Sequence, residues 1–242
     1  MPTWRKQNQT ICSWPSNPEG LIEMIGGSYL SATPQISYRY LLESLLRKNL
    51  AVHAWKYVPG FDHQAQANEA WKNFRECREK LESRIGGKYE PIRLGHSLGC
   101  KLHLLAPDGG RNSKSLIALS FNNFNADKSI PMLGKVKRKL NIYTEFSPSP
   151  SETMNLILKK YNQPNNLLIK FSNDNIDQNI QLLDILKNRS TDNSNMIVLN
   201  GDHLTPIKTG FRESFPKESF LNTGTDSNII KLVDTIISFS KV

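Results

Sequence analysis

Gly95-His96-Ser97-Leu98-Gly99 is the stretch that decides the fold of this chain. It has the pattern G-x-S-x-G, with a short apolar run before it and a segment compatible with a helix after it. This setting predicts a sharp strand-to-helix turn that exposes the serine hydroxyl beside a backbone N–H. Glycines suit such a turn because the neighbouring side chains must be small. We therefore interpret Ser97 as a nucleophile; the alternative is a turn that merely needs glycine.

Strands and helices alternate along the rest of the chain. Apolar runs typical of buried strands cover about 20–25, 50–58, 92–94, 115–121, 167–171 and 196–199, and helical patterns cover about 37–48, 64–84, 98–105, 178–187 and 227–239. This alternation predicts an α/β fold with a mostly parallel sheet and helices on both faces. The length of 242 residues fits a single domain, 1–242.

One region, about 122–165, breaks the alternation. Ser149-Pro150-Ser151-Glu152 has the form of a capping box with proline at the first helical position, which predicts a helix as far as Lys160. Connections this long in compact domains are usually functional. We expect a small helical cap insertion over the active site; the alternative is an ordinary helical excursion at the surface.

A serine nucleophile needs a base, and the base needs an orienting acid. His203 follows the last predicted strand of the sheet, which is the expected place for the base, and His63 is its rival. Asp174 is favoured as the acid because it lies nearer the strand end. Asp177 is the alternative acid, although it could instead cap the next helix, and Asp202 is a weaker candidate.

The negative charge that develops during acyl transfer requires preorganised N–H donors. One donor is expected to be the amide of Leu98, directly after the nucleophile. The other is expected from the loop Gly26-Gly27-Ser28-Tyr29, most simply Ser28 or Tyr29. The alternative for this loop is a tight turn without a catalytic role.

The composition of the chain limits which cofactors, binding partners and cellular compartment we expect. The chain has 31 Lys+Arg against 22 Asp+Glu, and its net charge of +9 favours peripheral contact with an anionic membrane or an acidic carrier protein. Three scattered cysteines without C-x-x-C spacing indicate a reducing compartment and no zinc or redox motif. We expect no cofactor, no metal and no nucleic acid. Without a signal segment or transmembrane span, the chain is expected to be cytoplasmic, or plastid if from a plant.

At this point the ordered segments resemble a known superfamily. The Gly26-Gly27 loop, the Ser97 elbow, an aspartate after the next strand but one, and the Gly201-Asp202-His203 loop are similar to those of α/β-hydrolases. More narrowly, Gly201-Asp202-His203-Leu204-Thr205-Pro206 and the segment 146–153 resemble the cyanobacterial and plastid DUF1350 family. The resemblance implies an α/β-hydrolase fold lacking much of the N-terminal antiparallel sheet, and no particular substrate.

Three functions are consistent with these residues. The first is hydrolysis of carboxylic esters or thioesters through an acyl-enzyme on Ser97, acting on a small-molecule or lipid-like acyl substrate. The second is acyl transfer to an acceptor other than water. The third is a non-catalytic binding or assembly protein, because a fold does not by itself determine a function.

Overall fold

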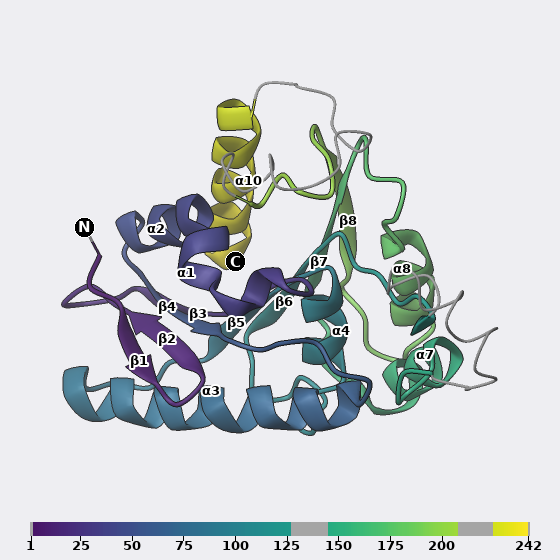
Figure 1. Ribbon diagram of the computed structural model, residues 1–242, viewed down its shortest axis with the longest axis horizontal. Coiled ribbons are helices and arrows are strands. Elements are labelled where there is room, and N and C mark those ends of the chain that lie inside the picture. Colours follow the sequence, from purple (N-terminus) through teal and green to yellow (C-terminus); the bar gives the residue numbers. More distant parts are fainter. Residues whose placement is uncertain (1, 127–144, 208–224, 242) are drawn as a thin grey trace, which may run out of the picture.

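The computed structural model describes residues 2–126, 145–207 and 225–241 (Figure 1). The strands are β1 (Arg5–Gln7), β2 (Thr10–Ser13), β3 (Gly20–Ile25), β4 (Leu50–Trp55), β5 (Pro91–His96), β6 (Ser115–Leu119), β7 (Asn166–Phe171) and β8 (Asn195–Leu199). The helices are the 3-10 turn η1 (Leu30–Ala32), α1 (Pro34–Ser37), α2 (Arg39–Arg47), α3 (His63–Ile85), α4 (Leu98–Leu104), α7 (Pro150–Lys160), α8 (Asn179–Lys187) and α10 (Thr225–Ser240). The expected alternation of strands and helices is present.

The strands form one eight-stranded sheet in the order β1-β2-β4-β3-β5-β6-β7-β8. Strands β3 to β8 are parallel, whereas β1 and β2 pair antiparallel at the edge next to β4. The sequence pattern did not indicate β1 and β2, because strands of three and four residues are too short to show a period. The order reverses between β3 and β5, and ligands of parallel sheets bind at such a switch point.

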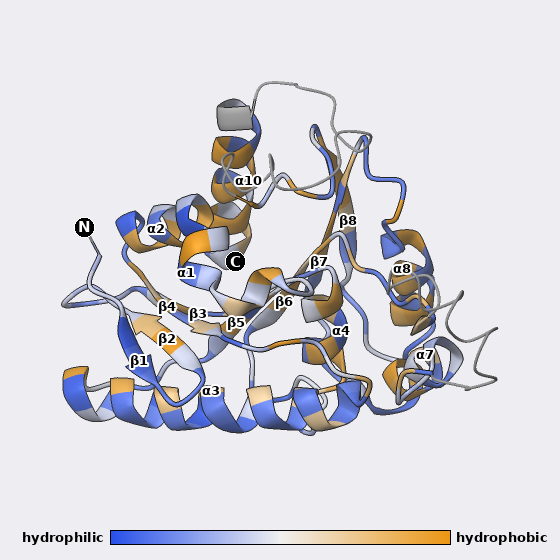
Figure 2. Cartoon of the chain, in the orientation of Figure 1, coloured by the Kyte–Doolittle hydropathy of each residue, from blue (hydrophilic) through white to orange (hydrophobic). Residues whose placement is uncertain are grey.

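Helices cover both faces of the sheet, as predicted. On one face α2 packs on β4 and α10 packs on α2 and β8, in a cluster that includes alternate strand residues such as Ile22 and Val52. On the other face α3 and α4 cover Ile25 and Trp55, and α7 and α8 cover the part of the sheet around Leu168. Figure 2 shows the helices carrying hydrophobic and hydrophilic residues in alternation, as expected for elements with one buried face. No helix in the described ranges is long and apolar enough to cross a membrane.

The described parts of the expected cap insertion flank residues 127–144, which lie outside the described residues. Helix α7 begins with the predicted capping box: Ser149 Oγ accepts from the Glu152 amide, and Glu152 Oε2 accepts from the Ser149 amide at 2.9 Å. Ile157 of this helix is fully buried in a core cluster that includes Leu182 of α8. The single domain and the cap stay predictions.

The turn between β5 and α4 is tightly constrained. Ser97 has φ 54° and ψ −122°, a backbone conformation that non-glycine residues rarely adopt. A Cβ on Gly99 would lie 2.0 Å from the Ile25 carbonyl oxygen, and one on Gly95 would lie 2.6 Å from Cys100 Cα. Glycine at these two positions therefore lets α4 approach β3 and β5 closely enough to form the turn.

We expect Gly99→Ala to destabilise the fold, because the added Cβ would meet the backbone of β3 and force it to shift. Overpacking of this kind costs about 1–3 kcal/mol or more. Urea unfolding followed by circular dichroism measures the loss. Gly60→Ala is the matched control, since its Cβ would meet only the Gln66 side chain at 3.8 Å. Equal stability of the two variants would contradict this account of the turn.

Candidate active site

A cavity of about 410 Å³ opens at the carboxyl ends of the parallel strands. It is bordered by the loop after β3, the elbow after β5, the segment after β6 and the loop after β8. The lining residues are Gly27, Ser28, Tyr29, Leu30, Pro59, Gly60, Phe61, His63, His96, Ser97, Leu98, Lys101, Asn122, Asn123, Phe124, Phe146, Ile176, His203 and Leu204. The fold thus brings Ser97, His203 and both expected donor segments to one cavity.

Ser97 lines this cavity and has 8% of its surface exposed. Its Oγ accepts a hydrogen bond from Asn122 Nδ2 at 2.8 Å. A serine hydroxyl that accepts from an amide still has its own proton to donate to a base. Sequence reasoning missed Asn122, although its place just beyond β6, at the carboxyl edge of the sheet, was an available signal.

His203 and Asp174 form a hydrogen-bonded pair. His203 Nδ1 lies 2.8 Å from Asp174 Oδ2, while the other oxygen of Asp174 accepts from the Ile176 amide at 3.0 Å. Burial alone would raise the pKa of Asp174, but the hydrogen bond and charge of His203 outweigh it and hold that pKa below its usual range. The Asn173 amide donates to the Gly201 carbonyl, so the two loops carrying the pair are joined directly.

Asp177 and Asp202 have other partners. Asp177 accepts from both the amide and the side chain of Asn179, the first residue of α8, while Gln178 occupies the N-cap position. Burial raises the pKa of Asp177 to about 6, opposite to the shift at Asp174. Asp202 Oδ1 accepts from the Leu204 amide, and the Asp202 amide donates to Thr205 Oγ1, so Asp202 shapes the loop that presents His203.

His63, the rival base, also lines the cavity but is differently placed. Its ring lies against Phe146, with ring centroids 4.2 Å apart. Among the described residues neither of its ring nitrogens has a hydrogen-bond partner, so no carboxylate orients it. Burial and the charge of Lys101 lower the pKa of His63 to about 3. The geometry required of an oriented base is present at His203 and not at His63.

A chain of hydrogen bonds links the loop after β3 to the loop carrying His203. The Gly27 amide donates to Tyr38 Oη at 2.7 Å, Tyr38 Oη lies 2.8 Å from His96 Nδ1, and His96 Nε2 lies 2.9 Å from the His203 carbonyl oxygen. Burial lowers the pKa of His96 to about 3, so its ring is neutral. A carbonyl can only accept, so Nε2 carries the proton and Nδ1 accepts from Tyr38.

This chain of bonds also narrows the choice of oxyanion donors. The Gly27 amide is engaged by Tyr38, which leaves the next residues of the loop, Ser28 and Tyr29, both on the cavity wall. A Cβ on Gly27 would lie 3.2 Å from Ser97 Cβ, so this loop passes close to the serine. Leu98 begins α4, and the first amides of a helix have no acceptor within it. The predicted donors therefore flank Ser97.

Two aromatic rings and the buried ammonium group of Lys101 also line the cavity. Phe61 and Phe146 lie with ring centroids 5.9 Å apart. Lys101 is almost fully buried on α4; its Nζ donates to the Pro148 carbonyl at 3.0 Å and lies 5.9 Å from the Phe146 ring centroid. Burial lowers the pKa of Lys101 to about 8. The cavity thus suits an apolar group and holds one positive charge.

Comparison with known families and structures agrees with this architecture. A family model described as "Protein of unknown function (DUF1350)" matches residues 3–218. No curated protein has a sequence that matches this chain.

Solved structures share the fold at low sequence identity. The monoacylglycerol lipase of Paleococcus ferrophilus is 16% identical with a TM-score of 0.58, over 95% of this chain and 99% of that one. Est1E from Butyrivibrio proteoclasticus is 12% identical with a TM-score of 0.57, over 100% and 99%. The thioesterase domain from the curacin biosynthetic pathway is 11% identical with a TM-score of 0.57, over 98% of both chains. These likenesses confirm the predicted α/β-hydrolase fold.

We expect Tyr38→Phe to loosen both loops that the buried chain of bonds connects. Without the hydroxyl, the buried Gly27 amide and His96 Nδ1 lose their partner, at a cost of about 1–3 kcal/mol for an unsatisfied group. Hydrogen exchange followed by mass spectrometry should then be faster in peptides covering 26–30 and 200–207. Tyr161→Phe, which removes a buried hydroxyl bonded to Asn166, is the control. Unchanged exchange at both loops would contradict the coupling.

Proposed function

We propose that this chain, which belongs to the DUF1350 family and has the α/β-hydrolase fold, is a serine hydrolase of carboxylic esters or thioesters. The observation that carries the proposal is the 2.8 Å hydrogen bond between His203 Nδ1 and Asp174 Oδ2, beside a cavity that Ser97 lines from a strained turn. Ser97 follows β5 and would supply the nucleophile, His203 follows β8 and would supply the base, and Asp174 follows β7 and would supply the orienting acid.

In the first step His203 acts as the general base. Its Nδ1–H donates to the carboxylate of Asp174, which leaves the lone pair on Nε2 available for the Ser97 proton. Because Asn122 donates to Ser97 Oγ, the serine proton is free to point toward the base. As Nε2 takes that proton, Oγ attacks the carbonyl carbon of the substrate and a tetrahedral intermediate forms.

The intermediate carries negative charge on the former carbonyl oxygen. The amide of Leu98 and an amide of Ser28 or Tyr29 would stabilise this oxygen, and one such donor contributes roughly 100- to 1000-fold to turnover. The intermediate collapses when His203 returns the proton to the leaving alcohol or thiol, which leaves an acyl group on Ser97. Water, activated by the same base, then attacks the acyl-enzyme and releases the acid.

The cavity supports a small or medium acyl group as the substrate. Its volume of about 410 Å³ is at the lower end of the range for small-molecule sites. Aromatic side chains of Phe61, Phe124 and Phe146 contribute apolar surface, which favours an apolar acyl chain. Esterase, lipase and thioesterase are names carried by solved structures with the same fold, and they are consistent with this chemistry.

We expect a fluorophosphonate probe to label the folded protein at Ser97. The probe reports an activated serine without requiring the natural substrate. Ser97→Ala should remove the label, and His203→Ala should slow labelling by several orders of magnitude, because the serine loses its base. Intact-mass and peptide mass spectrometry locate the label.

The same experiment separates the alternative functions. Absence of labelling in folded protein would contradict the hydrolase and favour a non-catalytic binding role. If labelling occurs, p-nitrophenyl esters and acyl thioesters of increasing chain length test hydrolysis, and added alcohols or amines test acyl transfer. Faster breakdown of the acyl-enzyme with an acceptor than with water alone would favour an acyltransferase.

Asp174→Asn should slow labelling and ester turnover about 10,000-fold, because the amide lacks the negative charge and its NH2 group can donate to Nδ1, which favours the wrong tautomer of His203. Asp177→Asn is the matched control, since that carboxyl accepts from Asn179 rather than from the histidine. Stopped-flow or gel-based labelling rates measure both variants. A larger effect at Asp177 than at Asp174 would reverse the assignment of the acid.

A further inference from the structure

A row of buried polar side chains crosses the face of the sheet that α3 covers. Cys12 of β2 is the register partner of His53 on β4, and His53 is the register partner of Glu23 on β3. Register partners on neighbouring strands project from the same face. All three side chains are buried, with exposures of 1% or less. Glu23 is paired with Arg78 at 3.2 Å, whereas Cys12 is a free thiol.

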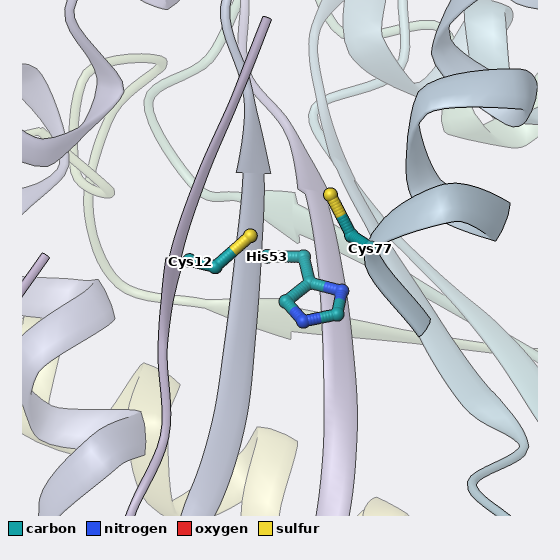
Figure 3. Close-up of side chains that lie close together, drawn as sticks. All are labelled: Cys12, His53 and Cys77. Carbon is teal, nitrogen blue, oxygen red and sulfur yellow. The ribbon is translucent and has the colours of Figure 1, made fainter. Parts of the chain in front are cut away.

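Helix α3 adds a second thiol to this row. Cys77 points from the buried side of the helix toward Cys12 and His53, and Figure 3 shows the three side chains lying close together. One ligand atom from each residue, the two Sγ atoms and a ring nitrogen, lies within 4.8 Å of the other two. Bonds of about 2–2.3 Å to one ion would bring such atoms roughly 3.5–4 Å apart, so small side-chain adjustments suffice.

The imidazole of His53 has no other partner to explain its burial. It is 0% exposed, and neither of its ring nitrogens has a hydrogen-bond partner among the described residues. Leaving a buried polar group unsatisfied costs about 1–3 kcal/mol, so such a group requires an explanation, of which a bound ion is one. An imidazole nitrogen and two thiol sulfurs in this arrangement are the donor atoms that soft metal ions prefer.

We propose that Cys12, His53 and Cys77 together bind one thiophilic d10 cation, Zn²⁺ or Cu⁺. Thiolate sulfur selects these ions over hard cations such as Mg²⁺ and Ca²⁺, and imidazole is a good ligand for both. Binding forms two metal–sulfur bonds and one metal–nitrogen bond, and the two thiol protons pass to solvent. No oxidant or reductant takes part.

The position of the cluster indicates a structural role for the ion. It would connect β2 and β4, which are the second and third strands of the sheet, with helix α3, and these three elements come together only in the folded chain. Since the ligands are buried, the ion would enter as the chain folds, and its binding free energy would add to folding. None of the three residues lines the Ser97 cavity, so the proposal is independent of the hydrolase function.

The test begins with the reduced, full-length protein, stripped of metal with a chelator under denaturing conditions and refolded with Zn²⁺, Cu⁺ or no metal. Inductively coupled plasma mass spectrometry measures the metal bound per chain. Competition with a chromophoric chelator measures the affinity. We expect one equivalent of one of the two ions, together with a higher thermal midpoint than that of the metal-free protein. The two arms identify which ion is bound.

Cys12→Ser, Cys77→Ser and His53→Gln should each weaken binding by at least about 100-fold, because loss of an outer-shell partner alone costs 10- to 100-fold. Cys100→Ser is the matched control: this buried thiol donates to the Leu119 carbonyl and lies outside the cluster. It should bind metal like the original chain. Circular dichroism verifies that each variant is folded.

X-ray absorption spectroscopy on the metal-loaded original protein keeps the proposal testable if a variant does not fold. We expect two sulfur ligands at about 2.3 Å and at least one nitrogen ligand around a bound zinc ion, or the corresponding sulfur-rich shell for copper. Failure of the reduced, refolded protein to bind either ion would overturn the proposal. Binding that persists in all three ligand variants, or a metal without sulfur ligands, would do so as well.

Discussion

The close contact between helix α4 and strand β3 is the constraint on which the candidate site depends. Gly99 packs with its Cα against the Ile25 carbonyl, where no side chain fits. That contact holds the start of α4 beside the end of β3, directly after Ser97 with its positive φ of 54°. The loop after β3 then passes within contact distance of Ser97. The close approach of these backbone segments thus sets the position of Ser97 beside the loop after β3.

Neutral buried groups connect the two sides of this cavity. His96, inside the elbow, uses both ring nitrogens, one toward Tyr38 and the other toward the His203 carbonyl. Because burial keeps the ring neutral, each nitrogen has a single role, and the direction of every hydrogen bond in the chain follows. His96, next to Ser97 in the chain, therefore holds the loop that carries His203 through a hydrogen bond of its neutral ring.

The face of the sheet that α3 and α4 cover also carries a row of buried polar side chains that runs from β5 to β2. There the interior contains thiols, an imidazole and ion pairs, including Arg93 with Asp108 at 2.7 Å. Buried charges are costly unless they are paired, and these pairs are short and shielded from solvent. The candidate metal ligands lie at the end of this polar row, and neither ring nitrogen of His53 has a hydrogen-bond partner among the described residues. The two candidate sites occupy separate regions of one sheet.

The order of apolar runs and glycines in the sequence by itself determined the parallel sheet, the elbow at Ser97 and the loops after the strands, because strand and helix periods are local properties. Only the tertiary structure shows which aspartate pairs with His203, since both Asp174 and Asp177 follow β7 and Asp174 is the one hydrogen-bonded to it. The hydrogen bond from Asn122 to Ser97 and the Cys12–His53–Cys77 cluster could not be predicted from the sequence, because their contacts join segments far apart in the chain. The spacing of residues along the sequence does not predict such contacts, because the order of the strands and the packing of the helices bring these residues together.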